Sequence, residues 1–184
     1  MATQTGEALM TSIDPVFAAL ADRIAIQDCV ARYMRGQDRL DAALQKGAFH
    51  PDARVDYGFF VGSAAEFVDF AQTLLARYHA TWHMTGQMLI EIDGDRATGE
   101  IYFHAWHRRD GDEGPQDLQI AGRYLDVYER RDGRWAIAHR REVVDWTRSD
   151  PAADDWFDRT PAALRGGRKG NDPSDIIGES HGPI

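Results

Sequence analysis

The 184-residue sequence has a single cysteine, Cys29, which excludes a disulfide within the chain and any metal site built from several thiolates. No apolar run approaches the roughly 18 residues of a membrane-spanning helix. The first residues, Met1 to Gly6, lack the basic start and apolar stretch of a secretory signal. Basic residues are in deficit, 21 against 30 acidic ones, and the net charge of −9 argues against a nucleic-acid partner. We therefore expect a cytoplasmic protein that binds neither nucleic acid nor membranes.

Hydrophobic residues make up 43% of the chain and charged residues 28%, as in ordinary globular proteins. The length fits one domain, which we place at residues 14–149. Residues 1–13 have no periodicity and are expected to form a disordered leader.

The composition changes after Asp150, since four of the seven prolines lie in residues 151–184. We expect residues 150–184 to form a C-terminal extension that docks in part on the domain. Trp156, Phe157 and Leu164 would provide the anchors. The stretch from Gly166 to Asn171 is expected to be mobile, and the extension is a candidate lid for a pocket.

The first part of the domain has helical periodicity. Asp14 followed by Pro15 is a helix start, and apolar residues recur every three or four positions to about Arg35. Gly36 is expected to interrupt this helix, and a short second helix is predicted over residues 38–45. Residues 50–53 are predicted to turn into a short strand at 54–57. Ser63 and Glu66 form a capping-box pair that opens a third helix, whose apolar positions are Phe67, Phe70, Leu74, Leu75 and Tyr78.

The second part has strand patterns. Alternation from Thr81 to Ile92 predicts one strand face with Trp82, Met84, Met88, Ile90 and Ile92, and an opposite face with His83, Thr85 and Gln87. Asp93-Gly94 and Asp132-Gly133 predict tight turns, and residues 111–115 a longer one. The segments between them predict a four-stranded antiparallel meander. Helices followed by a curled sheet are typical of an α+β cone.

Several segments resemble the SnoaL-like branch of the nuclear-transport-factor-2-like superfamily, over residues 14–148. They are Ala25-Ile26-Gln27-Asp28, Tyr33 with Gly36-Gln37-Asp38, Tyr78-His79 with His83, and the run YERRDGRW at residues 128–135. The resemblance implies an α+β barrel, in which a cone-shaped, curved mixed β-sheet wraps around the N-terminal helices and encloses a pocket. It also implies cofactor-free lyase chemistry, since dehydratases and a dehydrochlorinase belong to that family.

The same resemblance implies roles for single residues. His83 matches a general base and Asp38 its carboxylate partner. Tyr33 matches a pocket tyrosine and Arg140 a pocket arginine. His79 also has a counterpart in the family, and we assign it to substrate binding rather than to the base.

These residue types suit a β-elimination, which needs a base, help for the leaving group and a dry site. A carboxylate bonded to one ring nitrogen of His83 fixes the tautomer and stabilises the imidazolium. Arg140 can stabilise developing negative charge, and Tyr33 and Tyr57 can donate hydrogen bonds. Four aromatic residues are candidates for an apolar wall: Phe59, Trp82, Trp106 and Trp146.

Each of these residues also has a structural alternative. His83 can be a core histidine, Asp38 a turn residue and Tyr33 a packing residue, and Arg140 can pair with Glu142 or Asp126. A metal site is a further alternative, because two pairs of histidines lie close together in the sequence, His79 with His83 and His104 with His107. The first pair lacks the Glu of a His-Glu-x-x-His helix, so we expect no metal and no other cofactor.

The sequence thus predicts a cofactor-independent lyase that uses a His83–Asp38 dyad on a hydrophobic, cyclic or aromatic, hydroxylated small molecule. Dehydration and release of a small aldehyde such as formaldehyde, from a lignin-derived diaryl compound, both remain open. A non-catalytic ligand-binding or assembly module is one alternative, and an isomerase or cyclase is another. The apolar face with Trp82, Met84, Met88 and Ile90 predicts a homo-oligomer, with a trimer ahead of a dimer.

Overall fold

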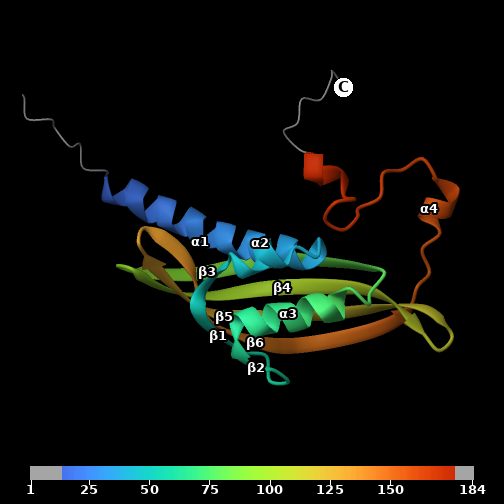
Figure 1. Ribbon diagram of the computed structural model, residues 1–184, viewed down its shortest axis with the longest axis horizontal. Helices are drawn as coiled ribbons and strands as arrows, with labels where there is room; N and C mark the ends of the chain where they lie inside the picture. Colours follow the sequence, from blue (N-terminus) through green and yellow to red (C-terminus); the bar gives the residue numbers. More distant parts are fainter. Residues whose placement is uncertain (1–13, 177–184) are drawn as a thin grey trace, which may run out of the picture.

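The computed structural model describes residues 14–176, so the expected leader at residues 1–13 lies outside the described residues. Three helices and a curved sheet form the domain (Figure 1). The helices are α1 (Pro15–Asp38), α2 (Ala42–Lys46) and α3 (Ala64–Leu75). The strands are β1 (Phe49–Asp56), β2 (Val61–Ser63), β3 (Ala80–Asp93), β4 (Arg96–Gly111), β5 (Gly114–Arg131) and β6 (Arg134–Pro151). The extension carries α4 (Trp156–Arg159) and the 3₁₀ helix η1 (Pro173–Ile176).

The six strands follow the order β2-β1-β6-β5-β4-β3. The meander from β3 to β6 is antiparallel, as predicted, and β1 joins it by pairing in parallel with β6. Because β2 and β3 are opposite edges, the mixed sheet stays open. The predicted α+β cone is therefore confirmed as a curved, unclosed sheet that carries helices. None of the helices within residues 14–176 is long and apolar enough to cross a membrane.

Helix α1 begins as predicted and ends later than predicted. The Asp14 side chain accepts a hydrogen bond from the backbone N–H of Val16 at 2.8 Å. The helix then continues through Gly36 to Asp38, because Gly36 serves a close approach to α2 and does not break the helix. A Cβ at this position would lie 2.7 Å from the Cβ of Gln45. Asp38 is thus the last residue of α1, and α2 begins only at Ala42.

The apolar face predicted for α1 is buried only in its second half. Ile26, Cys29, Val30 and Tyr33 are fully buried in the core, whereas the first turns of the helix are exposed. The exposed apolar residues are Val16, Phe17, Leu20 and Ile24. The capping box of α3 is present as predicted, with Ser63 and Glu66 bonded to each other's backbone N–H.

One predicted turn is wrong, and another is shorter than predicted. Residues 50–53 belong to β1, which pairs with β6 across an irregularity between Phe49 and Arg54. The turn at residues 111–115 is shorter than predicted, because β4 reaches Gly111 and β5 starts at Gly114. Gly114 has a φ of 118°, a conformation that favours glycine and allows the chain to reverse in two residues.

Strand β3 contains a bulge that changes which residues face the helices. Thr85 pairs with Phe103, whereas Met88 pairs with Ile101, so β3 carries one extra residue between them. Successive side chains of a strand alternate between faces, and one extra residue reverses the alternation. Met88, Ile90 and Ile92 therefore share the inner face with His83.

The predicted continuous apolar face of β3 is wrong for this reason. Ile90 is 5% exposed on the inner face, whereas Trp82 and Met84 are 47% and 46% exposed on the outer face. The outer face of the sheet also carries Trp106, which pairs with Trp82, and Trp146, whose partner in β5 is Ala121.

Candidate active site

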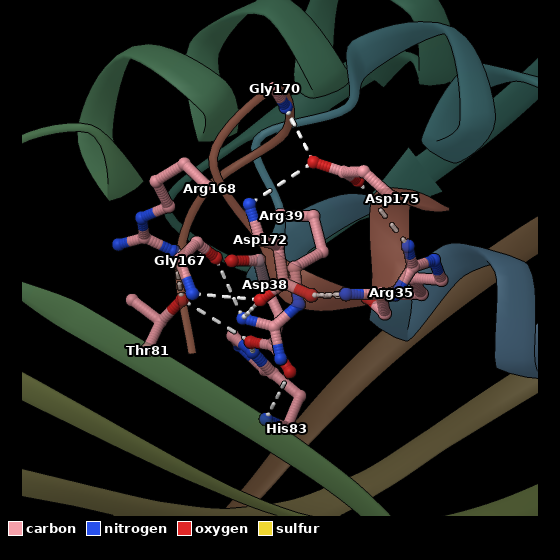
Figure 2. A network of polar contacts seen from close by, with 11 residues as sticks. Arg35, Asp38, Arg39, Thr81, His83, Gly167, Arg168, Gly170, Asp172 and Asp175 are labelled. Carbon is pink, nitrogen blue, oxygen red and sulfur yellow. Dashed lines mark hydrogen bonds and ion pairs between the residues drawn. The ribbon is translucent and has the colours of Figure 1, made fainter. Parts of the chain in front are cut away.

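Asp38 and His83 are brought together where the C-terminal end of α1 meets β3. The ring Nδ1 of His83 lies 2.7 Å from Oδ1 of Asp38, and the backbone N–H of His83 donates to Oδ2 at 2.9 Å (Figure 2). Thr81 donates its hydroxyl hydrogen to Oδ1 at 3.2 Å. Because a carboxylate only accepts, the hydrogen of neutral His83 belongs on Nδ1. Nε2 is then the basic atom of the ring.

Both members of this pair are shielded from water, with side-chain exposures of 5% for His83 and 8% for Asp38. Asp38 comes from the end of a helix and Thr81 and His83 come from alternate positions of one strand. Alternate strand residues point the same way, which explains why both reach the same carboxylate.

His83 lines a cavity of about 120 Å³ between α3 and the inner face of the sheet. Its polar lining consists of Gln37, Tyr57, His83, His107, Tyr124 and Glu142. The rest is apolar and includes four phenylalanines, Phe59, Phe67, Phe70 and Phe103. Phe59 and Phe70 are 70% and 42% exposed, which places them at the opening. Among residues 14–176, none after Glu142 lines the cavity, so the described part of the C-terminal extension does not contribute to its wall.

His107 stands next to the dyad. Its ring centroid lies 5.1 Å from that of His83, with the rings nearly perpendicular. Burial, together with the neighbouring His83, lowers the pKa of His107 to about 4. His107 is therefore neutral at pH 7. Its buried Nδ1 has no hydrogen-bond partner among residues 14–176.

Glu142 is a second titratable group of the cavity wall. Burial raises the pKa of Glu142 to about 7, and the nearby Arg140 opposes this shift. A carboxyl group with this pKa can give or take a proton at neutral pH. Sequence reasoning considered Glu142 only as a partner for Arg140. The signal for its position was present, because residues two apart on a strand share a face and Arg140 was already a pocket candidate.

The tyrosines form a layered arrangement. The hydroxyl of Tyr57, at the cavity, lies 2.7 Å from that of Tyr33, which is fully buried behind it. Tyr33 also donates to Oε1 of Gln37 at 3.3 Å. Burial raises the pKa of both Tyr33 and Tyr57, as it does for Tyr124. These side chains thus remain neutral hydroxyls that can donate hydrogen bonds.

Arg140 lies behind the cavity wall and does not line it. Its guanidinium is packed between the rings of Tyr33 and Tyr124, at 4.2 Å and 3.9 Å from their centroids. It donates to both carboxylate oxygens of Asp126, at 2.8 Å and 2.6 Å. Pairing with Asp126, one of the two structural alternatives for this residue, is therefore present, and it is buried instead of exposed.

Several candidate residues lie away from the cavity. His79 is exposed and bonded to Asp110 at 2.8 Å. Trp106 lies on the outer face of the sheet, as do the other two tryptophans considered for the wall, Trp82 and Trp146. Of the four substrate-binding candidates, only Tyr57 and Phe59 reach the cavity. Within the described part of the chain, no cluster of three His, Cys, Asp or Glu side chains could hold a metal ion.

Comparison with known proteins finds a family whose model matches the chain. The chain matches the SnoaL-like domain over residues 18–141. A search of curated proteins finds no match.

Solved structures with the same fold include several enzymes. A hexachlorocyclohexane dehydrochlorinase (LinA, type 2) has 25% sequence identity and a TM-score of 0.68, over 76% of this chain and 97% of its own. The type 3 enzyme from Novosphingobium barchaimii has 23% identity and a TM-score of 0.67, over 75% and 96%. A scytalone dehydratase-like protein from Novosphingobium aromaticivorans has 18% identity and a TM-score of 0.66, over 75% and 93%.

Proposed function

Because this chain belongs to the SnoaL-like domain family, we propose that it is a cofactor-independent lyase with a His83–Asp38 dyad. The observation that carries the proposal is the 2.7 Å contact between Nδ1 of His83 and Asp38, made at the wall of a cavity that includes four phenylalanines. The dehydrochlorinase similar to this chain supports elimination chemistry on a small molecule.

In the proposed reaction, Nε2 of His83 takes a proton from a carbon atom of the substrate. The electron pair left behind forms a carbon–carbon double bond, and the leaving group departs from the neighbouring carbon with its bonding electrons. Protonated Glu142 gives its proton to a departing hydroxyl group, which leaves as water. Asp38 stabilises the imidazolium of His83 during this step. The hydroxyl of Tyr124 can donate to negative charge that develops on the substrate, whereas Tyr57 uses its hydrogen in the bond to Tyr33.

The cavity favours a substrate with one ring. An apolar cavity of about 150 Å³ in another protein holds benzene, and this cavity is close to that size at about 120 Å³. A diaryl compound that releases formaldehyde would need Phe59 and Phe70 to move apart at the opening. We therefore propose dehydration of a cyclic or aromatic hydroxylated molecule first, and cleavage of a lignin-derived diaryl compound second.

An isomerase is the second candidate, and the presence of both His83 and Glu142 in the lining of the cavity favours it. A base and an acid in one cavity can remove a proton from one carbon and return a proton to another. The product then has the same mass as the substrate, so mass spectrometry separates the two reactions.

The dyad is tested with His83→Ala and Asp38→Asn, assayed on substrates found by a mass-spectrometric screen. We expect each to lower kcat/KM by about 10²- to 10⁴-fold, the usual contribution of a positioned base, with an unchanged circular dichroism spectrum. His79→Ala, which removes an exposed histidine, is the matched control and should keep full activity. Full activity in both dyad variants would contradict the mechanism. Ligand-induced thermal shifts without any product would instead identify a binding module.

We also propose that the protein is a homo-oligomer, a trimer ahead of a dimer. Its support is the outer face of the sheet, where Trp82, Met84 and Trp146 are each nearly half exposed. Apolar patches of this kind commonly mark subunit contacts.

A further inference from the structure

The C-terminal extension returns to the end of α1 and is held there by polar contacts (Figures 1 and 2). The backbone N–H of Lys169 donates to the carbonyl of Arg39 at 2.7 Å, and the Lys169 ammonium lies 2.8 Å from Asp41. Arg39 in turn donates to the carbonyl of Gly167 at 2.9 Å. The expected anchors Trp156 and Leu164 are 52% and 86% exposed. The stretch from Gly166 to Asn171, expected to be mobile, thus provides the attachment.

Hydrogen bonds within the extension hold the loop of residues 166–171 in place. The backbone N–H groups of Gly167 and Gly170 donate to the carboxylates of Asp172 and Asp175, each at 2.7 Å. Bonds from Ser174 and Gly167 hold the pKa of Asp172 well below its usual range. The loop that carries Arg168 is therefore fixed on both sides of that residue.

The Arg168 guanidinium reaches three chain segments around the dyad. Nη1 donates to the carbonyl of Asp38 at 2.6 Å and to the hydroxyl of Thr81 at 2.8 Å. Nη2 donates to the carbonyls of Tyr78 at 3.3 Å and Leu75 at 3.5 Å. Asp38 and Leu75 are the last residues of α1 and α3, whose final carbonyls have no partner within their own helix and favour a cation.

The contact with Thr81 has a directional effect. A hydroxyl group has one hydrogen, and a donor such as Arg168 can bind only to its oxygen lone pairs. The Thr81 hydrogen is therefore directed away from Arg168, toward Oδ1 of Asp38 at 3.2 Å. That same oxygen accepts the hydrogen bond from His83. Arg168, Thr81, Asp38 and His83 form one continuous chain of hydrogen bonds.

We propose that Arg168 is a positioning residue, which orients the carboxylate of Asp38 through Thr81 and the end of α1 and so fixes the tautomer of His83. The consequence for turnover rests on the proposed function, whereas the orientation of the pair does not. Arg168 does not line the cavity, and no carboxylate within residues 14–176 lies at salt-bridge distance from it. Replacing Arg168 should therefore lower kcat and leave KM nearly unchanged.

The experiment compares Arg168→Met and Arg168→Lys with Arg165→Met in the full-length protein. Arg165→Met is the matched control, because it removes the same charge from the same segment, where Arg165 is exposed and packs over Phe157 at 4.2 Å. The readout is the ¹⁵N NMR spectrum of the His83 ring at pH 8, assigned by its loss in His83→Gln. The ring nitrogens of a neutral histidine have different shifts according to which one carries the hydrogen.

We expect the native protein and Arg165→Met to have hydrogen only on Nδ1 of His83, and Arg168→Met to have a mixture of both tautomers. We also expect Arg168→Met to lower kcat about 10- to 100-fold, the effect of a misplaced catalytic group. Arg168→Lys should have a smaller defect, since its ammonium retains donors. A single native tautomer in Arg168→Met would overturn the proposal. If Arg168→Met fails to fold, Arg168→Lys provides the test, because a lysine ammonium cannot reproduce the contacts of both guanidinium nitrogens. A native tautomer together with a native kcat in Arg168→Lys would then overturn the proposal.

Inactivity of the native enzyme on every substrate would count against the proposed lyase alone, because the NMR result does not depend on turnover.

Discussion

At the residue scale, the cavity holds two side chains whose pKa values move in directions that favour their neutral forms. The pKa of His107 falls to about 4 and that of Glu142 rises to about 7, in both cases chiefly because burial disfavours charge. Between these values both groups are uncharged in the folded protein. His83 therefore faces a wall in which both groups are neutral between about pH 4 and pH 7, and which gains negative charge at Glu142 above that window.

Glu142 makes the stability depend on pH. Its pKa is raised from 4.5 to about 7, so between these pH values the unfolded chain releases the proton while the folded protein keeps it. The free energy of unfolding therefore falls as the pH rises through this window, by up to roughly 3 kcal/mol. We expect Glu142→Gln to gain several degrees of Tm over the native protein at pH 8, relative to the difference at pH 4. Thermal unfolding at both pH values measures this, with Glu113→Gln in an exposed turn as the control. A Tm difference that does not vary with pH would contradict the prediction.

The sequence could predict the contact between His83 and Asp38 because a family pattern relates two residues that are far apart in the chain. The residue type alone did not predict the position of Arg140. An arginine can line a polar pocket, as was predicted, or form a buried ion pair, as it does with Asp126. Which of these occurs depends on packing by Tyr33 and Tyr124, which no local pattern contains. Arg168 was not identified for the same reason, because its partners come from three distant segments.

At the element scale, the junction of α1 and α2 depends on a glycine in a helix interior. In an exposed helix, replacing glycine by alanine usually stabilises by about 0.5–1 kcal/mol. At Gly36 the added Cβ would lie 2.7 Å from the backbone nitrogen and Cβ of Gln45. Since backbone atoms cannot easily move aside, α2 would have to shift, and Asp38 lies only two residues further along α1.

We therefore expect Gly36→Ala to destabilise the protein by about 1–3 kcal/mol, the usual cost of overpacking. Urea denaturation followed by circular dichroism measures the change. The exposed Ala31 of α1 gives a comparison, since Ala31→Gly should cost only about 0.5–1 kcal/mol. A Gly36→Ala variant more stable than the native protein would show that glycine is not needed for the helix contact.

The elements were predicted better than their irregularities. Capping residues and tight Asp-Gly turns are local signals, and the start of α3 and the β5–β6 hairpin follow them. The end of α3 has no such signal, and the helix stops at Leu75, before the predicted helical position Tyr78. The bulge of β3 has a weaker local signal, Gly86, because an isolated glycine inside a strand pattern can mark a bulge. The alternation of the sequence continues across Gly86 and Gln87, and the pairing with β4 establishes the extra residue. The predicted apolar face of β3 was wrong because alternation assumes an unbroken register.

At the scale of the whole molecule, the outer face of the sheet carries exposed apolar side chains. The pair of Trp82 with Trp106, next to Met84 and Trp146, exposes apolar area on three strands. If this face joins subunits, a charge placed there should separate them. We expect Trp82→Glu combined with Trp146→Glu to convert the native oligomer into a 20.7 kDa monomer, as measured by light scattering after gel filtration. Leu164→Glu, on the exposed extension, should leave the assembly intact. A native protein that is already monomeric would rule the interface out.

The parallel pairing of β1 with β6 has a consequence for how the chain reaches its fold. β1 is synthesised early, whereas β6 begins only at Arg134. The two strands can therefore pair only after most of the chain has emerged from the ribosome. Until then β1 has only the short β2 as a strand partner, and its other edge remains open to other chains. The interval between the synthesis of β1 and that of β6 is therefore the period in which a nascent chain is most open to aggregation and to capture by chaperones.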